Sequence, residues 1–286
     1  MGVLYEKRNR VAYITINNPE KANTLDQPTI EELSQAWKDV WDDNDVRVAV
    51  ITGSGDRHFS AGHNLAGQQN LTQEQRQLRA VEGIFWPASG TIRGTKIGVD
   101  GRSGDHYPQI WKPVVAAVNG WAAGAGFYLV LTSADIRLAC EEHALFHHTF
   151  TSKGWLGGGP GASRLIRQIS YADAMRVLLA DEPFDAKEAL RMHIINEVVP
   201  HDKLMSRAEE TAEHIAKLPP VAVRMMKEFL IRFREVSVDE AWHVQQLMNS
   251  LLTQLTTDAD EGRKAFLEKR APEFTGGLRF REPPEA

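Results

Sequence analysis

The stretch 112–136 has the residue types needed to hold a negatively charged group with backbone atoms alone. Its apolar run 113–118 has the length and β-branched content of a buried strand, and Asn119-Gly120 marks a turn. Small residues at 122–126 precede a second apolar run at 127–131, so we expect a helix whose first turn is almost bare backbone. The N–H groups there lack carbonyl partners and face the positive end of the helix dipole, which favours an anion. Close packing of a helix on a strand also selects Gly and Ala. The sequence therefore leaves two interpretations of this stretch, an anion-binding helix start and a closely packed helix.

Two adjacent histidines, His147 and His148, are the side chains best suited to proton transfer at neutral pH, because an imidazole has a pKa of about 6.5. They follow Phe146 on a predicted strand, where neighbouring side chains point to opposite faces, so only one should enter a pocket. A hydrogen-bonded structural histidine is the alternative. A metal site is not favoured, since strand neighbours diverge and the sequence shows no evident third ligand.

Composition limits the class of protein. Of the 286 residues, 42% are hydrophobic and 25% are charged, as in an ordinary soluble globular protein. A formal net charge of −5 without a Lys/Arg cluster gives no sign of nucleic-acid binding. The single cysteine, Cys140, excludes an internal disulfide and a Cys-rich metal site, and its apolar context predicts an inert buried thiol. Residues 1–10 lack a signal-peptide core and no stretch reads as a membrane span, so we expect a cytoplasmic protein with no membrane partner.

The first third of the chain predicts an α/β fold. Residues 3–8 and 11–16 alternate as the two strands of a hairpin that turns at Asn9-Arg10. Apolar residues at three-and-four spacing predict an amphipathic helix over 28–43. The near-continuous apolar run 46–52 is typical of a parallel strand buried on both faces. Strand, helix and strand in this order imply a right-handed crossover.

The remainder predicts a core followed by helices. We expect a loop at 53–65, a long polar and irregular segment at 66–111 with one possible helix near 71–84, strands at 135–139 and 144–147, a loop at 157–161 and a helix at 162–169. From about residue 170 the pattern is almost all helix, with helices over 204–218, 220–234, 241–255 and 258–269. The predicted organisation is a core at 1–200, a helical region at 201–275 and a loose tail at 276–286.

Four stretches together resemble the crotonase superfamily, the enoyl-CoA hydratase/isomerase family. They are NPEKANTLD at 18–26, HFSAGHNL at 58–65, KPVVAAVNGWAAGAG at 112–126 and DADEGRKAFLEKRAPEF at 258–274. Their order and spacing fit the family, and the resemblance covers residues 3–275. It implies a spiral of ββα units with a C-terminal helical region that forms trimers or pairs of trimers, and coenzyme A only as part of an acyl-CoA substrate.

The resemblance also implies a site. Two backbone N–H groups, at His63 and Ala125, would form an oxyanion hole for the thioester oxygen and stabilise an enolate. Further positions would contact coenzyme A, with the last two supplied by a neighbouring subunit: Lys21, Ser60, Ala61, Leu65, Phe266 and Lys269. The polar segment 66–111 falls where the family has a variable element over the acyl pocket.

The chain departs from the family at the positions that carry acid–base chemistry. Water-adding members resemble one another in having two glutamates, and the matching residues here are Tyr128 and Phe150. Gly158 stands where isomerase and dehalogenase branches have an aspartate. Phe150 cannot move protons, and Tyr128, with an ordinary pKa of about 10, is a poor base at pH 7. The nearest replacements are His147 and His148, with Tyr128 as a possible proton donor.

Three hypotheses follow for function. The first is an enzyme that stabilises an acyl-CoA enolate and acts as an isomerase, a hydrolase or an atypical hydratase rather than an ordinary two-glutamate hydratase. The second is a catalytically silent protein that binds CoA esters on the same fold. A nucleotide-dependent oxidoreductase is the third; it is disfavoured because neither Gly53-Ser54-Gly55 nor Gly124-Ala125-Gly126 completes a dinucleotide-binding motif.

Overall fold

A central sheet of six strands organises the chain, in the order β1 (Val3–Arg8), β2 (Val11–Ile16), β3 (Val48–Gly53), β5 (Val114–Val118), β7 (Ile136–Cys140) and β10 (Glu197–Val199). The computed structural model describes residues 2–65, 72–74, 77 and 110–279. The first two strands form the predicted antiparallel hairpin, and every later pair is parallel. All residues of β3 and β5 are buried, as their apolar runs predict for a parallel sheet covered on both faces.

A second sheet of four short strands runs β4 (His58–Ser60), β6 (Trp121–Ala123), β8 (Leu145–His147) and β9 (Phe184–Asp185). The strands β3, β5 and β7 of the first sheet are followed along the chain by β4, β6 and β8 of the second. Each turn of the chain therefore adds one strand to each sheet. The predicted α/β spiral is confirmed.

Helices cover the sheets and complete the core. α1 (Gln27–Asp42) begins where the Asp26 side chain accepts a hydrogen bond from the Thr29 N–H. α3 (Ala125–Ser133) is buried along its whole length. α7 (His201–Ala216) packs on β3 and β5. Three shorter elements, α4 (Gly161–Gln168), α5 (Tyr171–Met175) and α6 (Ala186–Arg191), lie beyond β8, with a π-helical turn at Arg176–Ala180 after α5.

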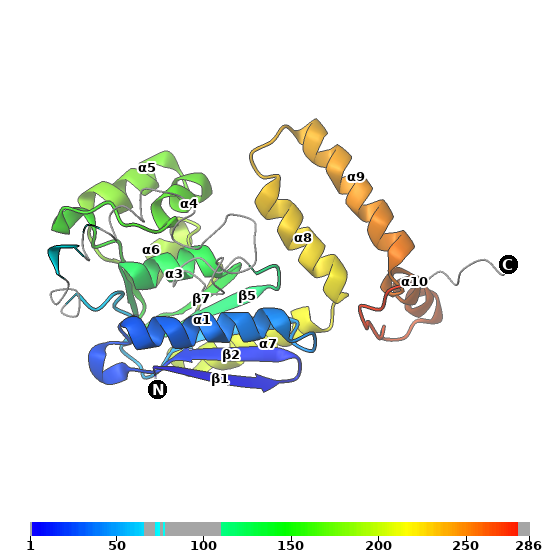
Figure 1. The fold of residues 1–286 in the computed structure, drawn as a ribbon, viewed down its shortest axis with the longest axis horizontal. Helices are drawn as coiled ribbons and strands as arrows, with labels where there is room; N and C mark the ends of the chain where they lie inside the picture. The colour runs from blue at the N-terminus through cyan, green and yellow to red at the C-terminus, as the bar shows by residue number, and fades with distance from the viewer. Residues whose placement is uncertain (1, 66–71, 75–76, 78–109, 280–286) are drawn as a thin grey trace.

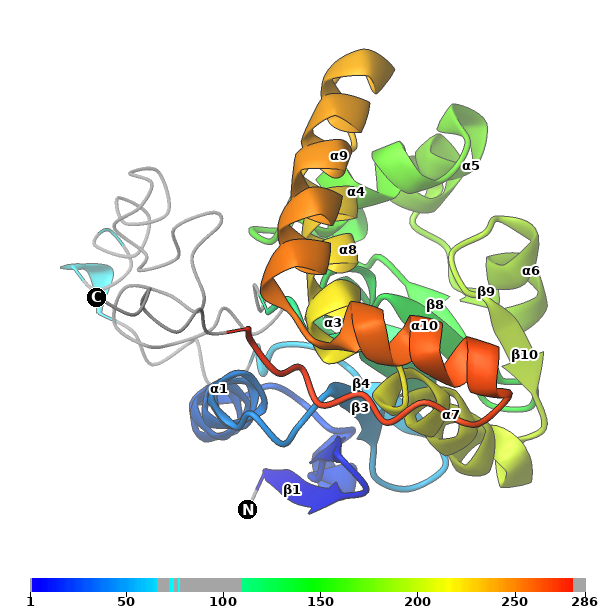
Figure 2. The same cartoon turned by 90° about the vertical axis from the view of Figure 1, so that its right-hand side faces the viewer.

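The C-terminal helices α8 (Pro220–Arg232), α9 (Val238–Leu255) and α10 (Asp258–Glu268) form an arm that stands away from the sheets (Figures 1 and 2). α8 and α9 run antiparallel and pack on each other, yet neither contains a buried residue. Their exposed side chains include the large apolar residues Met226, Leu230, Trp242, Leu247, Leu251 and Leu255. The predicted C-terminal helical region is thus present, and it presents apolar faces that the described part of the chain does not cover.

Three details differ from the sequence-based expectations. Residues 121–123 pair with β4 and β8 as a strand, so the Gly/Ala stretch at 122–126 is divided between that strand and the helix, which begins at Ala125. The predicted loop at 53–65 contains β4, and the region after residue 170 contains β9 and β10, because strands of two or three residues are too short to show periodicity.

The predicted loose tail is anchored where it is described. The N–H of Gly276 donates to a carboxylate oxygen of Asp258 at 2.9 Å, and the N–H of Arg279 donates to the carbonyl of Leu255 at 2.8 Å. The possible helix near 71–84 and the polar segment 66–111 lie largely outside the described residues. The division into a core at 1–200 and a helical region at 201–275 remains a prediction. None of the helices in the described part of the chain is both long and apolar enough to cross a bilayer.

Candidate functional site

A cavity of about 310 Å³ opens where three segments of the spiral meet. The segments are the loop after β4, the junction of β6 with α3, and the chain after β8. The lining residues are Ala61, His63, Leu65, Ala123, Gly124, Ala125, Thr149, Phe150, Lys153, Trp155, Gly157 and Gly158. Both predicted oxyanion-hole residues, His63 and Ala125, therefore line one cavity.

One side of this cavity, which we call the donor wall, consists of residues 60–63 and 123–126. Its two segments touch through their backbones. Gly62 has φ of +83°, and a Cβ there would lie 2.7 Å from the carbonyl oxygen of Ala123 and 2.8 Å from the nitrogen of Ala125. A Cβ on Gly126 would likewise collide with the backbone of Ser60. Glycine is required at both positions because the two loops approach too closely for a side chain.

Local hydrogen bonds fix the direction of the donor wall's amides. The N–H of Leu25 donates to the carbonyl of Gly62 at 2.8 Å, and the N–H of Asn64 donates to the carbonyl of Leu25 at 3.3 Å. In such a parallel bridge the N–H of the central residue, His63, points away from Leu25. Ala125 is the first residue of α3, so its N–H belongs to the helix turn that has no intrahelical acceptor. Gly124 makes the sharp entry to that helix with φ of +53°.

The opposite side, which we call the aromatic wall, consists of residues 149–158. Thr149 has φ of +61°, after which a 3₁₀ turn at Thr151–Lys153 brings Phe150, Lys153 and Trp155 to the cavity. The Lys153 ammonium donates to the carbonyl of Thr149 at 2.9 Å, which closes the turn. Phe150, the residue at the second glutamate position, presents its ring to the cavity.

Tyr128, the residue at the first glutamate position, lies directly behind the aromatic wall. Its side chain is fully buried, and its ring occupies the space beside Gly161 that a Cβ would need. Its hydroxyl lies within 2.9 Å of where a Cβ on Gly157 would be, and its ring centroid is 4.8 Å from that of Phe150. Gly157 and Phe150 both line the cavity. Only one layer of atoms thus separates Tyr128 from the cavity.

Burial determines the protonation state of Tyr128. It raises the pKa of the phenol to about 12, so the hydroxyl keeps its proton at neutral pH. That hydroxyl is 3.0 Å from Nε2 of His148 and 3.3 Å from the carbonyl oxygen of Leu156. The hydroxyl has one proton to donate and two acceptors within reach, so it is a donor rather than a base.

Neither His147 nor His148 is among the residues that line the cavity. β8 ends at His147, so strand alternation does not extend to His148, and a ring nitrogen of each histidine lies 3.6 Å from the same carboxylate oxygen of Asp181. His148 is buried and meets Tyr128, whereas His147 stacks on Trp121 with ring centroids 6.3 Å apart. Burial lowers the pKa of His148 below its ordinary value, although the carboxylate of Asp181 acts in the opposite direction. His148 is accordingly neutral at pH 7 and can accept a hydrogen bond from Tyr128.

Asp181 is the residue that the sequence did not reveal. Its carboxylate accepts hydrogen bonds from the N–H of Thr149 at 2.5 Å and of Ser152 at 2.7 Å, which holds the start of the aromatic wall. The same group lies 3.6 Å from Nε2 of His147 and 3.6 Å from Nδ1 of His148. Burial alone would raise the pKa of this carboxyl, but the N–H and the hydroxyl of Ser152, the N–H of Thr149 and the nearby His148 together outweigh burial and hold the pKa below its ordinary value.

The residues expected to contact coenzyme A are dispersed within one subunit. Ala61 and Leu65 line the cavity, whereas the buried Ser60 hydroxyl donates to the carbonyl of Asn23 at 2.7 Å. Lys21 is exposed at the end of a 3₁₀ turn (Pro19–Lys21) near the N-terminal hairpin. Phe266 and Lys269 belong to the end of the C-terminal arm, on and just after α10, away from the cavity (Figure 1). Their predicted delivery by a neighbouring subunit remains a prediction.

Comparison with known proteins identifies the family. Residues 6–84 and 104–277 match the family described as enoyl-CoA hydratase/isomerase. The chain is 33% identical to (E)-benzylidenesuccinyl-CoA hydratase of Thauera aromatica over 276 residues, covering 96% of this chain and 100% of the relative. It is also 33% identical to carnitinyl-CoA dehydratase of Proteus mirabilis, covering 94% and 96%.

Solved structures agree with the sequence comparison. The crystal structure of enoyl-CoA hydratase from Bacillus anthracis superposes with a TM-score of 0.82 at 28% identity, over 96% of this chain and 100% of that one. The chain therefore belongs to the enoyl-CoA hydratase/isomerase family, within the crotonase superfamily.

Proposed function

We propose that the protein adds water to, or removes it from, an acyl-CoA thioester at its α,β-carbons, and that the N–H groups of His63 and Ala125 hold the thioester oxygen. The observation that carries this proposal is the donor wall, where both residues line one cavity and their loops touch through backbone atoms. When water adds to the β-carbon, negative charge moves to the thioester oxygen. Two preorganised N–H donors and the start of α3 suit that charge.

The names of the relatives support hydration over other reactions of an enolate. Similar proteins are a benzylidenesuccinyl-CoA hydratase, a short-chain enoyl-CoA hydratase and a carnitinyl-CoA dehydratase. All three names describe the gain or loss of water at an acyl-CoA. We therefore choose an atypical hydratase among the reactions that the oxyanion site allows.

We assign proton transfer to Tyr128 with His148 behind it, in place of two glutamates. In hydration Tyr128 would give its proton to the α-carbon while the water oxygen bonds to the β-carbon. The proton that the water releases would return to the Tyr128–His148 pair, which restores the hydroxyl. Tyr128 keeps its proton at pH 7, and the neutral His148 ring contacts the same oxygen. Because Phe150 and Gly157 stand between Tyr128 and the cavity, the Phe150 ring must turn or Gly157 must shift for the hydroxyl to meet the acyl chain.

Isomerisation of the double bond is the second candidate. It requires only that one group remove a proton and return it at another carbon. The neutral His148 ring would take that proton by way of the Tyr128 hydroxyl and return it the same way, and the described residues that line the cavity include no acidic side chain. The two reactions differ in product, since only hydration consumes the conjugated enoyl thioester in favour of a hydroxyacyl one.

The cavity also suggests the kind of acyl group. Leu65, Phe150 and Trp155 give it an apolar and aromatic lining, and Lys153 supplies a cation at its edge. Such a lining suits a bulky or aromatic acyl chain that carries a carboxylate, rather than one that carries a quaternary ammonium group. The benzylidenesuccinyl-CoA hydratase relative, by its name, acts on an acyl group of the first kind.

A panel of thioesters tests the proposal. The purified protein is incubated with benzylidenesuccinyl-CoA, crotonyl-CoA, crotonobetainyl-CoA and a 3-enoyl-CoA, and products are separated by mass. We expect a product heavier by one water, formed fastest from the aromatic carboxylate. An isomeric product from the 3-enoyl-CoA alone would favour the second candidate. Tight binding without turnover of any ester would instead identify a silent CoA-ester binding protein.

We further propose that the protein assembles into trimers or hexamers through the arm. The uncovered apolar faces of α8 and α9 support this, as does the position of Phe266 on α10, away from the cavity of its own subunit. Replacing Trp242 and Leu251 by Glu should release monomers in sedimentation velocity. A monomeric wild-type protein would contradict the assembly.

A further inference from the structure

We propose that Asp181 is the positioning residue of the Tyr128–His148 pair, and that its carboxylate orients the His148 ring to accept the tyrosine hydroxyl while it holds the turn of the aromatic wall. The inference rests on the proposed function, because it assigns to Asp181 the support of the groups that would move protons there. Asp181 would be the third residue of this group, and it lies in a part of the chain that contains none of the four family motifs.

The geometry places one buried carboxylate between the wall and the ring. The Asp181 side chain is 3% exposed and that of His148 is also 3% exposed. Hydrogen bonds from the N–H groups of Thr149 and Ser152, at 2.5 and 2.7 Å, fix both carboxylate oxygens. Nδ1 of His148 lies 3.6 Å from one of these oxygens, so the contact is electrostatic and becomes a hydrogen bond with a small shift of the ring.

The carboxylate selects one tautomer of His148. In the described part of the structure Nδ1 of His148 is buried and has no hydrogen-bond partner, and Asp181 is the charged group that faces it. If Nδ1 were bare, its lone pair would point at a negative charge. A proton on Nδ1 removes that repulsion and leaves Nε2 as an acceptor for the Tyr128 hydroxyl at 3.0 Å. The other groups that surround the ring are His147 and the edge of Phe150.

The backbone conformation at Asp181 is one that glycine adopts more easily than aspartate. Its φ of +51° is in the left-handed region, which glycine adopts most easily. The residue ends the π-helical turn at Arg176–Ala180, and such turns are frequent at functional sites. A carboxylate with four polar neighbours at a position suited to glycine indicates that the carboxylate itself has a role.

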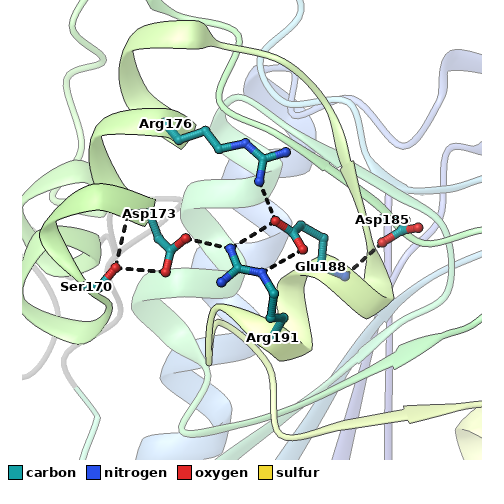
Figure 3. A network of polar contacts seen from close by, with 6 residues as sticks. All are labelled: Ser170, Asp173, Arg176, Asp185, Glu188 and Arg191. Carbon is teal, nitrogen blue, oxygen red and sulfur yellow. Dashed lines mark hydrogen bonds and ion pairs between the residues drawn. The ribbon is translucent and has the colours of Figure 1, made fainter.

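Figure 3 shows a network of ion pairs between residues that precede Asp181 in the chain and residues that follow it. Arg191 on α6 contacts Asp173 on α5 and Glu188 on α6, and Arg176 on the π-helical turn also contacts Glu188. The network joins the elements on either side of Asp181. Single exposed ion pairs contribute little, but a shared network limits the movement of the loop between them.

The first test is the tautomer of His148 in the wild-type protein. Histidine-labelled protein is studied by ¹⁵N NMR at neutral pH, and the His148 signals are assigned by their loss in His148→Gln. We expect the proton on Nδ1. A ring protonated on Nε2 alone would overturn the proposal. The measurement needs no substrate, so it can fail or succeed independently of the proposed hydratase activity.

The second test uses a pair of matched variants. Asp181→Asn keeps an oxygen acceptor for one of the two wall N–H groups but removes the charge that faces His148. We expect kcat to fall about 10- to 100-fold with KM changed less, and the acid limb of the pH–rate profile to move to lower pH. Asp173→Asn, the same substitution in the network, weakens one contact of Arg191 and leaves the Arg191–Glu188 and Arg176–Glu188 pairs in place, so kcat should stay within about twofold.

A folding failure leaves the proposal testable. Asp181→Gly fits the left-handed backbone and removes the carboxylate, so it should fold and lose kcat as Asp181→Asn does. Folded Asp181 variants with wild-type kcat and an unchanged pH profile would overturn the proposal. An equal loss in Asp173→Asn would do the same, since it would show that the segment matters only for stability.

Discussion

The donor wall and the aromatic wall face one cavity but are built in different ways. The donor wall acts through backbone atoms, and its segments are brought together by glycines at 62 and 126. The aromatic wall acts through side chains, and its support comes from Tyr128, His148 and Asp181, which are far apart in the sequence. In the proposed function the donor wall would hold the thioester and the aromatic wall would move protons, so the two tasks fall on separate parts of the fold.

The largest expected effect comes from removing one donor of the donor wall. Ala125→Pro deletes the N–H, yet the first residue of a helix tolerates proline. We expect kcat/KM on the best thioester of the panel to fall about 100- to 1,000-fold. Ala125→Gly, which keeps the N–H, is the control and should lose far less. Equal losses in the two variants would mean that the methyl group, not the amide, matters.

The next effect comes from the aromatic wall. Tyr128→Phe keeps the ring that packs against Gly161 but removes the hydroxyl bonded to His148. Steady-state kinetics should show kcat reduced about 10- to 100-fold with the KM for the thioester little changed. Tyr13→Phe removes a hydroxyl that bonds Glu209 and should leave both constants as they are. Wild-type kcat in Tyr128→Phe would remove Tyr128 from the reaction.

A stability measurement tests how Tyr128 packs behind the aromatic wall. A Cβ on Gly161 would overlap the Tyr128 ring, whereas a Cβ on Gly158 would meet nothing within 4 Å. We expect Gly161→Ala to lower the free energy of unfolding by about 1–3 kcal/mol in urea titration. The matched Gly158→Ala should change it by less than about 0.5 kcal/mol. If the two variants were equally stable, the aromatic wall would not rest on Tyr128 as described.

The smallest effect is a pH dependence of stability from His148. Its pKa in the folded state is lowered by burial, so the unfolded chain binds the extra proton more readily. His148 therefore contributes to stability above pH about 6.5, which is the pKa of a histidine in the unfolded chain. The contribution is lost as the pH falls from there toward the lower pKa of His148 in the folded protein. His148→Gln should flatten the unfolding free energy over this window. An unchanged slope would show that His148 is not buried in its neutral form.

The two walls also differ in how far they could be predicted. The donor wall follows from contiguous motifs, since the run of small residues before Phe127 and the FSAGHNL loop each specify a backbone shape locally. The β-strand at 121–123 inside the first of these was missed because strand pairing over three residues leaves no periodicity. The hairpin and the long helices were predicted correctly because their apolar patterns extend over many residues.

The aromatic wall could be predicted only in part. Its histidines and Tyr128 were singled out, but the burial of His148 against Phe150 depends on packing that no local pattern contains. Asp181 was missed because it lies about thirty residues from the turn that it holds. An aspartate directly after a helix, where glycine is common, was the one signal that could have indicated it.

The central claim is that two backbone amides polarise a thioester carbonyl in this cavity. Infrared difference spectroscopy of a bound acyl-CoA labelled with ¹³C at the thioester carbon measures that polarisation directly. We predict that the C=O stretch moves to lower frequency on binding to the wild-type protein, and moves back toward its solution value in Ala125→Pro. A bound thioester whose stretch matches that of the free compound in water would contradict the claim.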